Sequence, residues 1–361
     1  MYMYKVTCVN TTDLGISNEN ALDIIKRIRN KSGFREASKP PTTSALQLLR
    51  EESKRNQHIV TFCRDLDKML GGGIPVSAVT EICGEPGVGK TQFGMQLAAD
   101  VQIPEKCGGI DGSAIFIDTE GSFMPERMAQ IADAVVTHLQ SSAHRHKNAQ
   151  ERLSAIEDIT RDRIMSKIWC FRVHDYVEQM STIKCLDSFV TSHAREKIRL
   201  VVIDSISFHF RRDFTNMSKR SRVLSEMSQE LHALARKHNL AVVMINQMTT
   251  RFMRKTQPYQ NYNNETKESR QAVLVPALGE SWSHASTNRI RLSRADGNLR
   301  VATLMKSPSL ARGKAFYRIT PSGVRGPKRS HKRPAPSALE SSSSSSSTAD
   351  ATTVTSKQRV M

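Results

Sequence analysis

The chain has 361 residues and a formal net charge of +18. This length is enough for one large domain, or two unequal ones, with a sizeable hydrophobic core. No apolar run approaches the roughly 20 residues that a membrane helix needs, and no cleavable signal pattern is present, so we expect a soluble intracellular protein without a membrane partner. The six cysteines are scattered without a C-x-x-C pair, which favours reduced thiols over a disulfide framework or a zinc site.

The positive charge is unevenly distributed along the chain. From Asp296 to the end, twelve lysines and arginines stand against only three acidic residues. The overall excess predicts a polyanionic partner or an anionic surface. Its concentration at one end predicts a basic tail that acts separately from the globular part.

The N-terminal part predicts a small module followed by a linker. Residues 1–30 indicate one helix with an apolar face, and one helix cannot bury a core alone, so we interpret them as a partial helical module. Residues 31–58 are polar and contain a Pro-Pro pair, which is typical of a linker. Within it, Phe34 and Ala37 could dock on a neighbouring subunit in an added edge strand, with local packing of the Phe as the alternative.

From residue 59 to residue 323, β-rich apolar runs alternate with amphipathic stretches. The runs predict strands at residues 78–83, 114–117, 168–173, 200–203 and 240–245. The stretches between them have helical spacing, for example at residues 124–139, 177–190 and 222–235. Apolar strands separated by amphipathic helices predict an α/β fold with a mostly parallel sheet covered on both faces. Short connections predict antiparallel strands at one edge, at residues 289–294, 299–306 and 315–319.

The glycine-rich stretch between the first of these strands and a helix carries the strongest signal. It consists of Gly84, Glu85, Pro86, Gly87, Val88, Gly89, Lys90 and Thr91. Glycines let the backbone close around an anion, and the helix N-terminus supplies free N–H groups and the positive end of its dipole. Lys90 can reach the β- and γ-phosphates, and the Thr91 hydroxyl can hold Mg²⁺. This pattern is that of a P-loop, and it predicts a site for ATP and Mg²⁺.

Further polar residues follow other expected strands of the same sheet. Asp204, after the run at 200–203, is placed to hold the Mg²⁺ shell. Glu120 can orient the water that attacks the γ-phosphate, although Asp118 is an alternative for that role. Gln247 has an amide that could sense the γ-phosphate and change the loop that follows it.

Residues 324–361 have no core-forming pattern and are predicted to form a disordered, basic and serine-rich tail. Its basic cluster includes Lys328, Arg329, Lys332 and Arg333. Such a cluster is typical of a nuclear localisation signal or a nucleic-acid contact, while a merely solvated tail is the alternative. We therefore expect a nuclear protein with some presence in the cytoplasm.

Four segments taken together resemble the RecA-like P-loop ATPase core of the strand-exchange recombinases. In order, they are residues 84–91, 116–127, 200–204 and 245–248. Three more segments resemble the C paralogue branch of the eukaryotic family, at residues 71–75, 101–105 and 275–282. The resemblance covers about residues 59–323, and residues 11–29 are similar to the end of the family's N-terminal helix-hairpin-helix domain.

The resemblance implies roles for the same residues. Lys90 and Thr91 would bind phosphate and Mg²⁺. Asp204 would be the Walker B carboxylate, Glu120 would activate water, and Gln247 would be the γ-phosphate sensor. In addition, Arg127 would pack on the adenine, while Phe34 and Ala37 stand where the family carries its subunit-linking Phe and Ala.

Two loops face DNA in this family, and both are basic in this sequence. The first corresponds to about residues 208–222 and the second to about residues 248–283. The cations expected to contact the DNA backbone are Arg211, Arg212, Lys219, Arg220, Arg222, Arg251, Arg254 and Lys255. A solvated mobile loop is the alternative, and the polar stretch at 257–269 has no assigned role.

The sequence thus predicts an ATP-binding, DNA-dependent ATPase with slow hydrolysis. The resemblance implies action on single-stranded and branched DNA, together with other recombinase paralogues in a hetero-oligomer. It also implies a role in homologous recombination, double-strand break repair and Holliday-junction processing. Two alternatives remain open: an assembly scaffold in which ATP is structural and hydrolysis dispensable, and a P-loop phosphotransferase unrelated to DNA.

Overall fold

A computed structural model of the chain describes residues 43–47, 49–50, 57–214, 216–254, 270–279 and 281–327. The chain divides into two units, Met1–His58 and Ile59–Met361. In the first unit the described residues are helical at 45–47 and 49–50. The predicted module at 1–30 lies outside the described residues, as do Phe34, Ala37, Lys255, Lys328, Arg329, Lys332 and Arg333.

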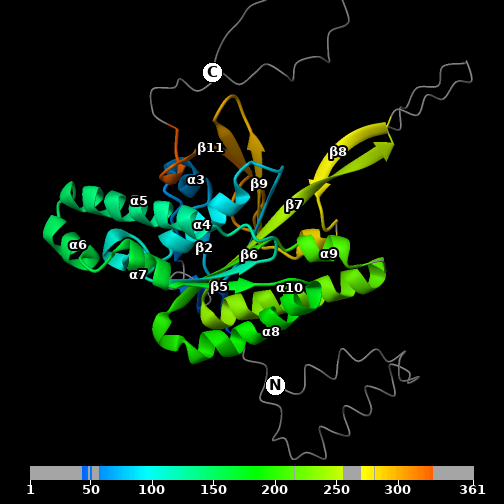
Figure 1. Cartoon of the computed structure of the whole chain (residues 1–361), viewed down its shortest axis with the longest axis horizontal. Coiled ribbons are helices and arrows are strands. Elements are labelled where there is room, and N and C mark those ends of the chain that lie inside the picture. The colour runs from blue at the N-terminus through cyan, green and yellow to red at the C-terminus, as the bar shows by residue number, and fades with distance from the viewer. Residues whose placement is uncertain are drawn as a thin grey trace, which may run out of the picture. The chain divides into compact units, whose positions relative to one another are not determined.

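The second unit is built around one large sheet (Figure 1). In chain order its strands are β3 (Val79–Gly84), β4 (Ser113–Asp118), β5 (Ile168–Arg172), β6 (Ile198–Asp204), β7 (Ala241–Arg254), β8 (Arg270–Pro276), β9 (Asn288–Arg294), β10 (Arg300–Lys306), β11 (Gly313–Thr320) and β12 (Gly323–Arg325). The spatial order is β12-β11-β10-β9-β3-β7-β6-β4-β5, and β8 pairs with β7 off this path. A separate two-stranded sheet pairs β1 (His58–Ile59) with β2 (Ile74–Pro75).

Helices cover both faces of this sheet, as the alternating apolar strands predict (Figure 1). The helices that contribute to one core are α3 (Arg64–Met69), α4 (Lys90–Asp100), α5 (Pro125–His144), α6 (Ala149–Ile156) and α7 (Arg161–Ser166). Those of the other core are α8 (Tyr176–Ser192), α9 (Phe208–Arg212) and α10 (Met217–His238). Strand β4 shows the division, because Phe116 packs in the first core and Ile115 and Ile117 pack in the second. None of the helices in the described ranges has the length and apolar character needed to cross a bilayer.

The predicted antiparallel edge is confirmed, because β9 pairs antiparallel with β10 and β10 pairs antiparallel with β11. The sequence did not predict how this edge joins the rest of the sheet. Strand β9 runs parallel to β3, and β10 is the first strand to reverse. The reason lies in the segment after β8, which contains η3 (Ser281–His284) and leads back to the start of β3. There the backbone N–H of Thr287 donates to the Val79 carbonyl oxygen at 2.8 Å. The chain therefore enters β9 at the same end of the sheet at which it enters β3.

Both segments expected to be loops contain regular structure. Strand β7 continues past Gln247 and forms a hairpin with β8, in which Met248 lies opposite Pro276 and Arg254 opposite Arg270. Pairs such as Thr249 with Val275 combine residues with high strand propensity, which explains why the strand does not end at its buried part. In the first segment, Asn216 caps α10 by accepting a hydrogen bond from the Lys219 N–H at 3.0 Å.

A buried ion pair ties the central strands together. Glu81 of β3 is fully buried, and its Oε2 accepts a hydrogen bond from Arg289 Nε of β9 at 2.7 Å. Its other oxygen accepts from Asn246 Nδ2 of β7 at 2.7 Å. One carboxylate thus connects three neighbouring strands, and Asn246 is the residue directly before Gln247.

We expect Arg289→Met to lower the free energy of unfolding by roughly 3–5 kcal/mol, because the buried Glu81 carboxylate would lose its cation. Urea denaturation followed by tryptophan fluorescence measures this loss. Arg291→Met is the control, since Arg291 lies on the same strand and forms no ion pair with a carboxylate in the described part of the chain. A loss below about 1 kcal/mol for Arg289→Met, the range of a surface pair, would contradict the expectation.

Candidate active site

The loop between β3 and α4 has the geometry of a phosphate-binding loop. Gly87 and Gly89 have φ angles of 74° and 92°, in the left-handed region that favours glycine. A Cβ atom at Gly89 would overlap the Ile319 side chain of β11, and one at Gly87 would lie 2.7 Å from Nη2 of Arg294. Only glycine therefore fits at these two positions, where the backbone leads into the N-terminus of α4.

Lys90 folds back over this loop. Its Nζ donates hydrogen bonds to the carbonyl oxygens of Gly84 and Glu85, each at 2.9 Å. Burial lowers the pKa of Lys90, and the negative charges of Asp204 and Glu120 oppose that effect. The ammonium group is thus held at the loop by neutral acceptors, which phosphate oxygens can replace with stronger, charge-assisted partners.

Asp204 ends β6 beside the first turn of α4. It is 3% exposed, and burial raises the pKa of its carboxyl group to about 6. A hydrogen bond from Thr91 and the charge of Lys90 lower this pKa, while the charges of Glu120 and Asp118 raise it further. Negative charge is therefore crowded at this point, and a divalent cation would relieve the crowding.

These residues fit a nucleoside triphosphate with Mg²⁺. The loop offers backbone N–H groups and an ammonium group for the phosphates. The Thr91 hydroxyl, which lowers the pKa of Asp204, and the Asp204 carboxylate are the hard oxygen ligands that Mg²⁺ prefers. Among the described residues, no group of three or more His, Cys, Asp or Glu is arranged for a metal.

Glu120 follows β4 and lies beside the end of β6. Its Oε1 accepts a hydrogen bond from Ser205 Oγ at 2.5 Å and another from Gln247 Nε2 at 2.5 Å. The side chain is solvent-exposed, unlike that of Asp204. Glu120 is therefore a carboxylate at the edge of the phosphate site that water can reach.

Asp118, the alternative to Glu120, is occupied by the turn after β4. Its Oδ1 accepts backbone N–H groups from Gly121 at 2.8 Å and Ser122 at 3.0 Å. Its Oδ2 forms an ion pair with Arg172 Nη1 of β5 at 2.9 Å. The buried Asp118 carboxylate thus shapes the turn that carries Glu120, which leaves Glu120 as the better candidate for orienting water.

Gln247 connects the phosphate site with both predicted DNA-facing segments. Its Nε2 donates to Glu120, while its Oε1 accepts a hydrogen bond from Arg211 Nη1 of α9 at 2.9 Å. Its backbone oxygen accepts from the Ala277 N–H, just after β8, at 2.9 Å. One residue of β7 therefore contacts a catalytic candidate, helix α9 and the end of the β7–β8 hairpin.

Arg127 lies in the first turn of α5, and its side chain reaches the turn between β11 and β12. Its Nη2 and Nη1 donate to the backbone oxygens of Thr320 and Pro321, at 2.8 and 2.6 Å. Its Nε donates to Gln92 Oε1 at 2.6 Å. Arg127 is thus fixed next to the start of α4, and its contact with adenine stays a prediction.

The predicted DNA-contacting cations occupy different environments. Arg211 and Arg212 lie on α9, and Lys219 and Arg222 are exposed on α10. Arg220 is 9% exposed, and its Nη2 donates to the Ala277 carbonyl oxygen at 3.3 Å. Arg220 thus differs from the exposed cations around it, because α10 turns its side chain inward, and its contact with DNA stays a prediction. Arg251 and Arg254 lie in the part of β7 that pairs with β8.

Sequence reasoning missed several residues that complete the site. Tyr317 of β11 is fully buried and donates its hydroxyl to the Val88 carbonyl oxygen at 3.1 Å, which braces the phosphate loop. Arg294, at the end of β9, adds a guanidinium beside Gly87. Ser205 supplies the second donor to Glu120. No local pattern marks these residues, since each acts through a contact with a distant part of the chain.

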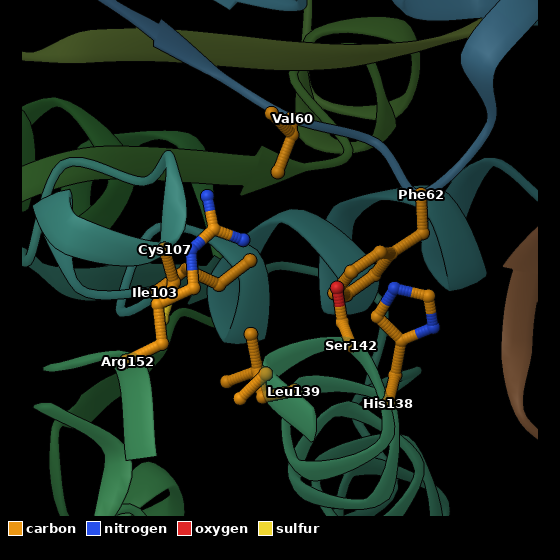
Figure 2. A pocket seen from close by; sticks show the side chains of 9 residues that line it. Val60, Phe62, Ile103, Cys107, His138, Leu139, Ser142 and Arg152 are labelled. Atoms are coloured by element: carbon orange, nitrogen blue, oxygen red, sulfur yellow. The ribbon is translucent and has the colours of Figure 1, made fainter. Parts of the chain in front are cut away.

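A separate pocket lies away from these residues (Figure 2). Phe62 and His138 face each other in it with ring centroids 4.6 Å apart, and Arg152 reaches in from α6. Another lining residue, Ile103, follows the end of α4, and that helix end lies about 15 Å along its axis from Lys90. The pocket volume of about 60 Å³ is far below the roughly 300–1,000 Å³ of small-molecule sites. It therefore takes no part in nucleotide binding.

Comparison with known proteins agrees with this geometry. The Rad51 family matches residues 53–152 and 144–327. The chain belongs to the Rad51 family. This confirms the resemblance and the RecA-like α/β core predicted from the sequence.

Three relatives illustrate the similarity. DNA repair protein RAD51 homolog 3 of Cricetulus griseus is 44% identical over 321 residues, which cover 87% of this chain and 82% of that protein. The protein of the same name from Dictyostelium discoideum is 36% identical over 291 residues, or 81% of this chain and 71% of its own. DNA repair and recombination protein RadA of Aeropyrum pernix is 34% identical over 283 residues, covering 78% and 76%.

The two neighbouring carboxylates should differ in their effect on stability. We expect Asp118→Ala to lower the free energy of unfolding by about 2–4 kcal/mol, because the turn N–H groups and Arg172 would lose a buried acceptor. Glu120→Gln should change it by less than about 0.5 kcal/mol, as for other exposed substitutions. Thermal denaturation of both variants measures the contrast, and equal losses would contradict this division of roles.

Proposed function

We propose that the chain is an ATP-binding, DNA-dependent ATPase that acts in homologous recombination and double-strand break repair. The observation that carries the proposal is the convergence of Lys90, Thr91, Asp204, Glu120 and Gln247 at one edge of a parallel sheet. Membership of the Rad51 family, with relatives named as DNA repair and recombination proteins, supports the connection with DNA.

The triphosphate would lie along the loop from Gly84 to Thr91. Lys90 would exchange its two carbonyl partners for phosphate oxygens, and Glu120 would orient the attacking water. Mg²⁺, held by Thr91 and Asp204, would supply charge neutralisation at the phosphate oxygens. The pairing of Glu120 with Ser205 and Gln247 fits slow hydrolysis, because both donors occupy the carboxylate before water does.

Nucleotide occupancy would control the grip on DNA through Gln247. A γ-phosphate beside Glu120 competes for the Gln247 amide, and Gln247 also holds α9 and the end of the hairpin. Its rearrangement would change the order of both segments, of which α9 carries Arg211 and Arg212 and the hairpin carries Arg251 and Arg254. Backbone contacts by Arg211, Arg212, Lys219 and Arg222 suit single-stranded and branched DNA, including Holliday junctions.

We infer that the chain works with other recombinase paralogues in a hetero-oligomer. Strand β5 ends the sheet and pairs only with β4 among the described strands, and such an edge can accept a strand from another subunit. Phe34 and Ala37 are the residues that we propose for the corresponding role on a neighbour. The cluster of Lys328, Arg329, Lys332 and Arg333 would direct the chain to the nucleus.

A scaffold is the second candidate function, and one observation favours it. Lys90 and Glu120 already have hydrogen-bond partners in the protein itself, so a bound nucleotide could serve mainly to stabilise the fold and its interfaces. In that case hydrolysis would be dispensable, while ATP binding would not.

Lys90→Ala and Glu120→Gln separate the two functions. We expect Lys90→Ala to weaken ATP binding by at least about tenfold, since a charge-assisted contact with phosphate is lost. Glu120→Gln should retain binding and slow hydrolysis by roughly 10²–10⁴-fold, because the amide cannot act as a base. Nucleotide binding, phosphate release and repair of DNA breaks in cells that carry each variant are the measurements.

DNA repair in cells that carry each variant decides between the ATPase and the scaffold. If both variants fail to restore repair, the ATPase function stands, whereas repair with Glu120→Gln alone supports the scaffold. Lys106→Ala is the matched control, because this lysine lies outside the site with its side chain 59% exposed, and it should behave as the unchanged protein does.

Binding to single-stranded DNA should require ATP and should weaken steeply with salt. Each phosphate contact adds about −0.7 to the slope of log affinity against log salt concentration. We therefore expect Arg212→Ala to make the slope about 0.7 less steep, as loss of one contact predicts. Fluorescence anisotropy of a labelled oligonucleotide, with and without ATP and Mg²⁺, measures both effects. Equal binding in the two conditions would rule out control by the nucleotide.

A further inference from the structure

The contact between Arg211 and Gln247 suggests how DNA could stimulate hydrolysis. We propose that Arg211 is a positioning residue that holds the Gln247 amide on Glu120 when DNA is absent, and that a DNA phosphate frees Glu120 by drawing the Arg211 guanidinium away. This inference rests on the proposed ATPase function. It adds a route from DNA to the water-orienting carboxylate through α9.

The orientation of the Gln247 amide follows from the chemistry of its partners. A guanidinium group can only donate hydrogen bonds, so Arg211 Nη1, 2.9 Å away, requires the amide oxygen on its side. The amide nitrogen then has to face Glu120, where it donates to Oε1 at 2.5 Å. The ionised Glu120 carboxylate only accepts hydrogen bonds and therefore favours the same orientation, while Arg211 anchors the other end of the amide. Arg211 therefore helps to hold the Gln247 amide on Glu120.

A DNA phosphate can displace Gln247 from Arg211. The amide oxygen of Gln247 is a neutral acceptor, whereas a phosphate carries negative charge and can accept two parallel hydrogen bonds from one guanidinium. Arg211 is exposed on α9 next to Arg212, so a polyanion can reach it without unfolding the site. The exchange thus favours the phosphate.

A second guanidinium strengthens this preference for an anion. Burial lowers the pKa of Arg220, and the positive charge of Arg211 lowers it further, which means that the two cations lie close enough to repel each other. A phosphate bound at Arg211 reduces this repulsion. Arg220 also braces Ala277, whose N–H donates to the Gln247 backbone, so the surroundings of Gln247 stay in place while its side chain moves.

The release of Gln247 changes the hydrogen-bond partners of the Glu120 carboxylate. With Gln247 released, Oε1 keeps Ser205 as a donor and gains a free acceptor site for water. In the hydrolysis step the water oxygen bonds to the γ-phosphorus while one water proton passes to the Glu120 carboxylate and from there to solvent. The bond from the γ-phosphorus to the bridging oxygen breaks with its electron pair on that oxygen, which leaves ADP and phosphate as the products. Arg211 touches neither reactant.

The test compares hydrolysis with and without DNA in Arg211→Met. The full-length chain is used in the assembly in which it purifies, with a single-stranded oligonucleotide at saturating concentration as the probe. We expect the DNA-free kcat of the variant to rise several-fold toward the DNA-stimulated value, so that stimulation falls below about twofold. The affinity for a fluorescent ATP analogue should stay within about twofold, because Arg211 acts through Gln247. Arg211→Lys, which keeps a donor, should restore most of the stimulation.

Two further variants serve as controls. Arg236→Met removes the same charge from an exposed position near the far end of α10, and it should leave the rates with and without DNA unchanged. Arg212→Met should demand more DNA for saturation but should retain the stimulation ratio.

The outcomes are distinguishable. Unchanged stimulation in Arg211→Met would overturn the inference, and so would a variant that binds ATP normally but is inactive both with and without DNA. If the unchanged protein itself shows no stimulation by DNA, the proposed DNA-dependent ATPase function fails, and this inference fails with it.

Discussion

The structure depends on the register of four parallel strands. In this register Gly84 of β3 lies opposite Gln247 of β7, and Asp118 of β4 lies opposite Asp204 of β6. Because parallel strands bring their carboxyl ends to one edge, residues that are far apart in the chain meet there. The Glu81 carboxylate holds β3, β7 and β9 together just below this edge. A shift by one residue would send every side chain on a strand to the opposite face and would separate the phosphate loop from its partners.

The carboxylates at this edge have different tasks because their environments differ. Asp118 is saturated by backbone N–H groups and by Arg172, so it shapes the turn. Asp204 is buried against the hydroxyl of Thr91 and suits a cation. Glu120 is exposed, and among the described residues its carboxylate accepts hydrogen bonds from the side chains of Ser205 and Gln247. An exposed carboxylate with exchangeable partners can respond to a ligand, whereas a buried and saturated one cannot.

The polar network continues from the phosphate site to the surface through Gln247. It joins Glu120 to Arg211 by its side chain and to Ala277 by its backbone. An amide is well suited to this position, since it donates at one end and accepts at the other. Helix α9 and the end of the β7–β8 hairpin both hydrogen-bond to Gln247, so a change at this residue affects both segments. The proposed coupling of nucleotide and DNA therefore needs only a local exchange of hydrogen bonds.

The sequence by itself determined the phosphate loop, the alternation of strands and helices, and the positions of Asp204 and Glu120 at strand ends. These features depend on contiguous patterns, because glycine spacing, apolar runs and the polar residues that follow them are local. Only the tertiary structure decided that β9 pairs in parallel with β3, that β7 continues into a hairpin, and that Arg220 is buried. It also decided that Arg211 meets Gln247 and that Tyr317 braces Val88. These outcomes depend on which distant groups come into contact, and the burial and pairing of a side chain are set by those neighbours and not by its own segment.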